Sequence, residues 1–380
     1  MRIEQKIWTR KKRWQTVSAS ENTFAPNLVL VFGKRELLEK KEYFVEIKNF
    51  YPEADILFAS TSGEIVDDSV SDESIAVTAI EFEKTKLKFA ELKINENLNS
   101  FQAGSLLAKE LNDEELIHVF LVSDGQNVNG SKLVEGLNDS LPNQVTVTGG
   151  LAGDGTGFQK TVVGLNRIPE ENIIAAVGFY GKELKIGYGS VGGWDTFGPQ
   201  RKITRSEGNI LYELDGQSAL DLYKIYLGDL AEKLPASVLH FPLSLQIENE
   251  EKSVVRTILS VNEKDKSMIF AGDMPEGSYT RFMMANFDRL IEGASRAAAE
   301  SMKKIKSRKP QLAILISCVG RKIVLDQRIE EEVEAVREIL GKSAKLCGFY
   351  SYGEICPFSN SNLCQLHNQT MTITIFSEGE

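Results

Sequence analysis

A thiol lies close to a guanidinium in the last part of the chain, and this pair could support covalent chemistry. Cys318 directly follows a run of apolar residues, and Arg321 comes three positions later. A nearby positive charge lowers the pKa of a thiol, and His367 could act as the base. The pattern also fits a buried structural cysteine, since cysteine is among the most buried residue types. Arg321 would then pair with a carboxylate, on a ligand or on Glu330 or Glu354.

Four clusters of small and polar residues each follow an apolar, strand-like run, at 60–64, 123–127, 149–155 and 348–354. Ligands of α/β proteins bind beyond the carboxyl ends of strands, and glycine there lets backbone amides approach closely. Any single cluster could be only a turn, but their equivalent places favour a binding site. The residues expected at this site are Ser60, Thr61, Gly63, Glu64, Asp124, Gly149, Gly150, Asp154, Thr161, Cys318, Arg321, Tyr352, Gly353, Glu354, His367 and Asn368.

The charges in these clusters suggest how a small metabolite would be held. Arg321 or backbone amides would take a carboxylate, and Glu64, Asp154 or Glu354 would take an amine. The glycines at 153–157 lack the lysine of a phosphate-binding loop. No residue of these clusters is expected to be catalytic in this binding site.

Only three histidines occur, His118, His240 and His367, and no two are spaced for a metal site. His118 lies within a strand-like run and is expected in the core. His240 has an apolar setting, so His240 or His367 could alternatively be the axial ligand of a haem. The four cysteines form no CxxC or CxxCH motif and are expected to be free thiols.

The overall charge of the 380-residue chain is -10. Such an acidic surface repels phosphate backbones, so no nucleic acid is expected as a partner. The basic run at 10–13 lies in residues 1–24, expected to be a polar tail that packs its tryptophans on the domain, with a membrane or nucleic-acid patch as the alternative. No apolar run is long enough for a membrane span, and no signal peptide is apparent, so a cytoplasmic location is expected.

Strand-like and helix-like stretches alternate along the chain, which predicts an α/β fold with mixed sheets. Strands at 75–82 and 86–94 are expected to form a hairpin. Two stretches share the order helix, strand, polar segment, helix, strand: 101–148 and 286–349, the second with a loop at 318–325. We therefore expect an internal duplication, with halves at 25–216 and 217–376.

Several motifs resemble those of the FIST family. The segment 57–65 (LFASTSGEI) is similar to a signature of the FIST N-terminal region, and so is the block formed by Asp124, Gly125, 149–155 and Thr161. The segment 215–223 resembles the joining segment. Residues 318–321, 348–355 and 366–370 resemble the C-terminal pattern. The resemblance covers roughly residues 25–376 and departs at Ala59-Ser60, where many members carry a cysteine.

The resemblance implies a cytoplasmic signal-transduction sensor without catalysis. It would bind a small, amino acid-like ligand between its halves. Its partner would be a histidine kinase, a diguanylate cyclase or phosphodiesterase, or a chemotaxis-type transducer, because the chain itself has no kinase or cyclase motif. The alternatives are a haem-binding nitric oxide sensor and a cysteine-dependent enzyme.

Overall fold

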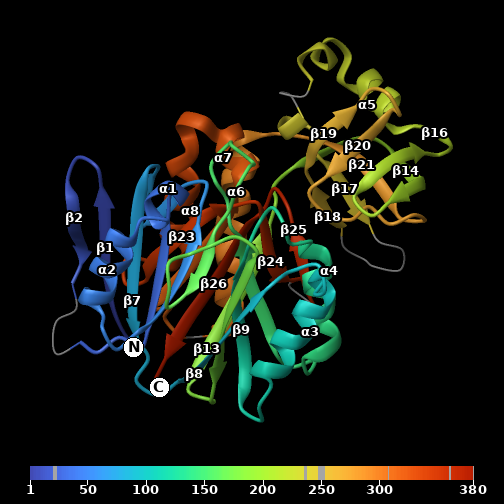
Figure 1. The fold of residues 1–380 in the computed structure, drawn as a ribbon. Helices are drawn as coiled ribbons and strands as arrows, with labels where there is room; N and C mark the ends of the chain where they lie inside the picture. Colours follow the sequence, from blue (N-terminus) through green and yellow to red (C-terminus); the bar gives the residue numbers. More distant parts are fainter. Residues whose placement is uncertain (20–23, 235–237, 247–252, 307, 359–360, 380) are drawn as a thin grey trace.

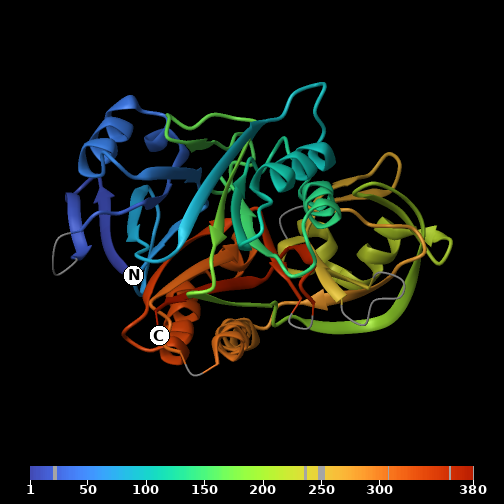
Figure 2. The same ribbon diagram turned by 90° about the horizontal axis from the view of Figure 1, so that it is seen from below.

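Three copies of one α/β unit form the core of the protein. The computed structural model describes residues 1–19, 24–234, 238–246, 253–306, 308–358 and 361–379. In each unit a parallel pair of strands is joined by a helical crossover, a later strand returns antiparallel to the first, and the strand that opens the unit lies outside it. Figure 2 shows the three units, coloured blue, teal to green, and orange to red, around a common centre.

The units run consecutively along the chain. Unit 1 contains β1 (Arg2–Thr9), β2 (Arg13–Ser18), β3 (Leu28–Gly33), α1 (Arg35–Leu38), α2 (Lys41–Phe50), β4 (Asp55–Ser60) and β7 (Ser74–Glu81). Unit 2 contains β8 (Lys86–Lys93), α3 (Ser100–Leu111), β9 (Leu116–Ser123), α4 (Gly130–Ser140), β10 (Thr146–Leu151) and β12 (Ile173–Tyr180). Unit 3 contains β13 (Leu184–Val191), α6 (Phe287–Ile305), β22 (Leu312–Cys318), α7 (Val319–Leu325), η3 (Asp326–Arg328), α8 (Ile329–Leu340), β23 (Lys345–Ser351) and β26 (Met371–Glu378).

Local sequence explains these elements. The first strand of the parallel pair in each unit (β3, β9 and β22) is a mainly apolar run that is buried along almost all of its length, as expected for strands covered on both faces. Asn99 and Gln102 form a capping box at the start of α3, and Asn129 accepts a hydrogen bond from the backbone N–H of Lys132 at the start of α4. Both helices therefore begin where the sequence predicts.

Each unit also lends a short strand to its neighbour. The chain that leaves β4 of unit 1 forms β5 (Glu64–Val66), which pairs with β23 of unit 3 and with β6 (Ser69–Ser71). The chain that leaves β23 forms β24 (Gly353–Pro357), which pairs with β10 of unit 2 and with β25 (Cys364–His367). The chain that leaves β10 forms β11 (Val163–Leu165), which pairs with β4 of unit 1. The three exchanges form a closed ring.

The predicted α/β class with mixed sheets is confirmed, and the repetition is more extensive than one duplication. The two stretches compared in the sequence are units 2 and 3, and unit 1 is a further copy. The expected hairpin of 75–82 and 86–94 is wrong, because β7 pairs with β1 and β3 whereas β8 pairs with β12. The expected loop at 318–325 forms α7, whose side chains Val319, Val324 and Leu325 are buried.

The expected polar tail at residues 1–24 is also corrected. Residues 2–9 and 13–18 form the hairpin β1–β2, which extends the sheet of unit 1 through β7. Ile3 and Gln5 point inward, and Trp8 packs against Tyr43 of α2 with ring centroids 4.8 Å apart. The strand was hidden in the sequence because charged residues occupy its other face.

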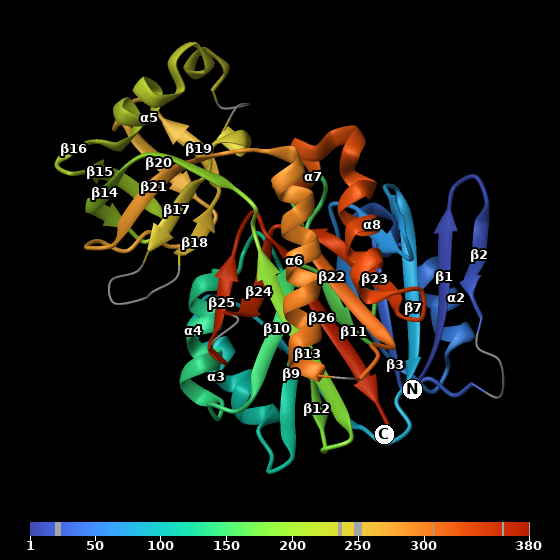
Figure 3. The same ribbon diagram turned by 180° about the vertical axis from the view of Figure 1, so that it is seen from behind.

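A separate β-rich lobe is inserted into unit 3 between β13 and α6 (Figure 3). Its strands are β14 (Asp195–Glu207), β15 (Ile210–Leu214), β16 (Gln217–Ser218), β17 (Leu243–Gln246), β18 (Ser253–Arg256), β19 (Ile258–Asn262), β20 (Ser267–Phe270) and β21 (Tyr279–Met284). Its helices are α5 (Ala219–Leu227), η1 (Gly228–Lys233) and η2 (Val238–His240). The lobe has its own apolar core. The predicted boundary at 216 and 217 lies inside it, where β15 pairs with β16.

The lobe stands to one side of the three units, as Figure 1 shows. Among the described residues, no helix combines the length and apolar character that crossing a membrane requires.

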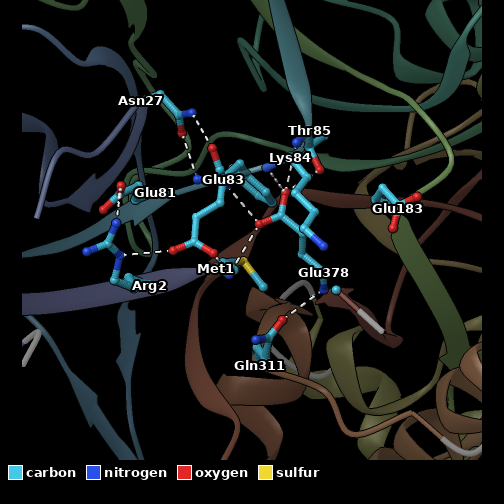
Figure 4. Close-up of polar contacts among 12 residues, drawn as sticks. Met1, Arg2, Asn27, Glu81, Glu83, Lys84, Thr85, Glu183, Gln311 and Glu378 are labelled. Carbon is cyan, nitrogen blue, oxygen red and sulfur yellow. Dashed lines mark hydrogen bonds and ion pairs between the residues drawn. The ribbon is translucent and has the colours of Figure 1, made fainter.

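The carboxylate of Glu378 links the three units at the end of the core opposite the lobe (Figure 4). Glu378 of unit 3 accepts hydrogen bonds from the backbone N–H groups of Glu83, Lys84 and Thr85, each at 2.9 Å. It also pairs with the amino terminus of Met1 at 3.2 Å. Burial opposes the ionisation of Glu378, but these bonds outweigh it and lower the pKa of the carboxyl. The linker between units 1 and 2 is thus fixed by unit 3.

Candidate functional site

The turns after β4, β10 and β23 meet at one end of the core and bond to one another. The backbone N–H of Gly153 donates to the carbonyl of Ser60 at 2.9 Å, and the N–H of Ser62 donates to the carbonyl of Tyr350 at 2.8 Å. The N–H of Tyr352 donates to the carbonyl of Leu151 at 3.2 Å. The structure therefore brings these three predicted clusters together, one from each unit, and the fourth joins them because the N–H of Ala152 donates to the carbonyl of Ser123 at 2.7 Å.

Two buried glutamates occupy equivalent places in these turns. In the pairing of strands, Glu64 of Thr-Ser-Gly-Glu-Ile lies opposite Phe349, and Glu354 of Ser-Tyr-Gly-Glu-Ile lies opposite Gly150. Thr61 and Ser74 donate hydroxyl hydrogen bonds to Glu64. Burial raises the pKa of Glu64 to about 7 and that of Glu354 to about 8.

Glu354 is satisfied by the protein in the same way as Glu64. Ser351 donates to Glu354 at 2.7 Å and the hydroxyl of Thr370 donates at 2.9 Å. Both glutamates are no more than 1% exposed. Neither is among the residues that line the large cavity beside the lobe, and their hydrogen bonds within the protein brace the turns.

Asp124 holds the second predicted cluster to unit 2. It accepts hydrogen bonds from the hydroxyl of Thr161 at 2.7 Å, from the backbone N–H of Gln126 at 2.7 Å and from that of Asn172 at 2.6 Å. Asp124 and Thr161 are both fully buried. Their role in this structure is to fix the loop that leads into α4.

The lack of a side chain at Gly149 and Gly348 makes room for the backbone of the neighbouring strand, not for a ligand. A Cβ atom at Gly149 would lie 1.9 Å from the carbonyl oxygen of Leu121, and one at Gly348 would lie 1.8 Å from that of Leu315. The two glycines are equivalent in units 2 and 3. Close packing of neighbouring strands therefore accounts for them.

Arg321 and Cys318 are both buried. The guanidinium of Arg321 is fully buried, bonds to Glu332 at 3.0 and 2.7 Å, and donates to the carbonyls of Gly192 and Leu290. These partners engage Arg321 inside the protein, and a bond from Arg321 to a ligand carboxylate stays a prediction. Burial also raises the pKa of the Cys318 thiol far above its ordinary value, which opposes nucleophilic chemistry.

The side chains of His118 and His367 are hydrogen-bonded inside the protein. Nε2 of His367 is hydrogen-bonded to the carbonyl of Cys356 at 2.9 Å, in a side chain that is 3% exposed. The ring of His118 lies between the hydroxyls of Thr146 and Thr148, as expected of a core histidine. His240 is half-buried in η2 but does not line the large cavity described next. The bond to Cys356 occupies one ring nitrogen of His367, and an axial role for His240 or His367 stays a prediction.

A cavity of about 830 Å³ lies between the lobe and units 2 and 3; we call it the lobe cavity. The predicted site residues Cys318 and Tyr352 line it. The other lining residues are Gly125, Gln126, Asn127, Val128, Asn129, Gly130, Leu151, Phe158, Asn209, Val238, Leu239, Thr257, Ile258, Leu259, Phe270, Ala271, Gly272, Asp273, Val319 and Gly320. The opening expected between two halves is therefore an opening between core and lobe.

Sequence reasoning missed the polar groups on the lobe side. Thr257 is 5% exposed, and its hydroxyl has no hydrogen-bond partner among the described residues. Asp273 accepts a bond from the side-chain amide of Asn129 at 3.2 Å, which joins lobe to core. Nothing in the sequence places residues 257 and 273 beside the start of α4. The sequence could have indicated the loop that includes Asn129 as part of the site, because this loop closely follows the predicted site residue Asp124.

One predicted residue has a buried amide with unmet hydrogen-bonding capacity. Neither Nδ2 nor Oδ1 of Asn368 has a partner among the described residues, and the side chain is fully buried.

The adjacent Gln369 donates to the carbonyl of Leu239 at 3.2 Å and contacts Gly320. Gln369 therefore lies directly behind the wall of the lobe cavity.

Models of two known protein domains match this chain. A model of the FIST N domain matches residues 27–217, and a model of the FIST C domain matches residues 219–357. The chain belongs to the FIST family. FIST domains are sensory domains of signal transduction.

Individual relatives add little detail. An uncharacterized protein of Methanocaldococcus jannaschii is 22% identical over 254 residues, which covers 59% of this chain and 47% of that protein. The chain thus spans about half the length of this curated relative. The crystal structure of cyanuric acid hydrolase from A. caulinodans covers 78% of this chain and all of that chain at 9% identity, with a TM-score of 0.19. At that score the likeness carries no argument.

Proposed function

We propose that this protein senses a small metabolite in the lobe cavity and passes the signal to a partner protein. The observation that carries the proposal is the cavity itself. Its volume of about 830 Å³ is within the usual range of small-molecule sites, and its walls are mostly apolar with a few polar groups. A small-molecule site would suit the sensory role of the FIST domains.

An amino acid-like metabolite fits the polar groups of the cavity. Asp273 offers a carboxylate to an amine, and the unpartnered hydroxyl of Thr257 offers a bond to a second polar group. Among the described residues that line the cavity there is no lysine or arginine. A ligand carboxylate would therefore rely on backbone amides and Thr257.

The lobe supplies a route for the signal. It joins the core through residues 192–194 on one side and 285–286 on the other. A ligand that contacts both walls would favour one angle between lobe and core, because a ligand shifts an equilibrium towards the state it binds better. We propose that a histidine kinase, a cyclic-di-GMP enzyme or a chemotaxis-type transducer recognises that change.

A thermal-shift screen of purified protein tests the proposal. Amino acids and related amines are added to the wild type, because a ligand of the folded state raises the unfolding temperature. Asp273→Asn and Thr257→Val are expected to abolish any shift. Asp221→Asn, an exposed aspartate paired with Lys266 in the lobe, is the matched control and should keep it. No shift with any small molecule would reject the proposal.

A further inference from the structure

Phe158 combines an exposed aromatic ring with an unusual backbone. It lines the lobe cavity and is 40% exposed. Its φ of 49° lies in the left-handed region, which a bulky side chain rarely adopts. Such backbone conformations cluster at functional sites because the surrounding structure must hold them.

Asp154 holds Phe158 in this conformation. Its carboxylate accepts hydrogen bonds from the backbone N–H groups of Phe158 at 2.8 Å, Gln159 at 3.0 Å and Lys160 at 3.0 Å. Burial opposes ionisation of Asp154, but the bond from the Tyr352 hydroxyl and those backbone bonds outweigh it and lower the pKa. Asp154 is therefore a positioning residue for the loop.

The ring of Phe158 stacks on that of Tyr352, with centroids 4.7 Å apart and planes at 18°. The hydroxyl of Tyr352 also accepts a bond from the N–H of Phe158 at 3.1 Å. One face of the Phe158 ring is thus covered by a fixed partner, and the residue is still well exposed at the cavity. A second flat ring could continue this stack.

The other residues that line the lobe cavity indicate which polar groups such a ligand carries. The side-chain amides of Asn127, Asn129 and Asn209 also lie in the wall, where each NH2 group donates a hydrogen bond within the protein, to Asp124, Asp273 and the carbonyl of Phe270 respectively. Asp273 is the one charged side chain among the described lining residues. These groups suit an amine or a ring N–H and offer no cationic side chain to a phosphate.

We infer that the lobe cavity takes a metabolite with a flat aromatic ring, which stacks on Phe158 while an amine or ring N–H reaches Asp273. The inference rests on the proposed function and adds the chemical class of its ligand. Packing alone does not explain Phe158, because glycine or asparagine would occupy this backbone conformation with less strain.

Isothermal titration calorimetry on the full chain tests this class. Tryptophan, phenylalanine, tryptamine and adenine form the flat set, and leucine and cyclohexylalanine form the non-aromatic set. Phenylalanine and cyclohexylalanine differ mainly in the aromatic ring. We expect binding within the flat set, and binding on the order of tenfold to a hundredfold weaker for Phe158→Leu.

Matched variants separate stacking from folding. Phe158→Tyr and Phe158→Trp should retain binding, and Phe50→Leu, which truncates a phenylalanine that is 41% exposed on α2, should leave it unchanged. Phe158→Asn should lose binding without a lower unfolding temperature, since asparagine tolerates the left-handed region.

Each outcome decides between the two proposals. Equal binding of phenylalanine and cyclohexylalanine, or full affinity in Phe158→Leu, overturns the aromatic class and leaves the sensor proposal standing. If neither set binds and the thermal-shift screen is also flat, both proposals fail. Binding that is lost in Phe158→Leu and kept in Phe158→Trp supports the inference.

Discussion

Glu64 and Glu354 make the stability of the protein depend on pH. Burial raises their pKa values to about 7 and about 8, whereas both start from an ordinary value of 4.5. At pH values between 4.5 and about 7 for Glu64, or about 8 for Glu354, the carboxyl group is protonated in the folded protein and ionised in the unfolded chain. The free energy of unfolding should therefore fall as pH rises from about 5, by about 1.4 kcal/mol per pH unit for each group that is still protonated.

Urea unfolding at several pH values between 5 and 8.5 measures this slope. Glu64→Gln removes one of the two titrating groups, so its stability should decline less steeply below pH 7 than that of the wild type. Glu36→Gln, which changes an exposed glutamate on α1, should keep the wild-type slope. Identical slopes for Glu64→Gln and the wild type would show that Glu64 is already ionised in the folded protein.

The cysteines should be unreactive in the folded protein. All four are buried, and burial raises the pKa of Cys347 and of Cys364 to about 12. Ellman's reagent at pH 8 should find no fast thiol until urea unfolds the chain, because the thiolate is the reactive form. Ile225→Cys, at a site 74% exposed, is the positive control. A fast thiol that Cys318→Ala removes would reopen the cysteine-enzyme alternative.

At the scale of elements, Gly149 and Gly348 permit the close approach of neighbouring strands. An alanine at either position would place its Cβ within 2 Å of a carbonyl oxygen on the adjacent strand. We expect Gly149→Ala and Gly348→Ala each to destabilise the protein by more than about 3 kcal/mol or to prevent folding. Gly155→Ala, with positive φ but nothing within 4 Å, should cost about 1–2 kcal/mol. Urea unfolding would measure all three, and equal losses would contradict the steric explanation.

The main elements could be predicted because each carries its own local signal. The strand at 173–180 and the helix that begins near Asn99 follow from apolar runs, helical periodicity and capping residues. The lending of β5, β11 and β24 to neighbouring units could not be predicted. Strands of three to five residues have little pattern, and their partners lie far away in the chain.

The candidate site was only partly predictable for a related reason. The sequence predicts Thr61 and Glu64 as ligand-binding residues because polar residues at strand ends often contact ligands. In the structure, the hydroxyl of Thr61 donates a hydrogen bond to Glu64 instead. Tyr352, which is expected at the site from the sequence, lines the lobe cavity. Phe158 gave no signal in the sequence, since its conformation depends on Asp154 and on a ring from unit 3.

At the scale of the whole molecule, the ring of exchanged strands should make the three units fold together. Unit 1 supplies β5 to unit 3 and receives β11 from unit 2. A fragment of residues 1–82 would lack β23, the partner of β5, and β11, the partner of β4, and would expose the face that packs on Phe120 and Phe349. We expect it to remain unfolded by circular dichroism. A fragment with a cooperative unfolding transition would contradict this interdependence.

The lobe should be separable from that ring. It has its own apolar core, and its first and last strands pair where they leave the core, with Asp195 opposite Met284. A short glycine-serine linker in place of residues 195–284 would therefore join two nearby points. We expect the remaining core to fold and to unfold cooperatively in urea, since the strand pairings within the three units do not involve the lobe.

The same variant tests the location of the site. Removing the lobe takes away Thr257 and Asp273 and opens the wall formed by Tyr352. Any ligand that raises the unfolding temperature of the full chain should have no effect on the shortened one. A ligand that still stabilises the shortened chain would place the binding site among the three units, beside the interlocked turns of Glu64 and Glu354, and would separate the sensory role of the core from the lobe cavity.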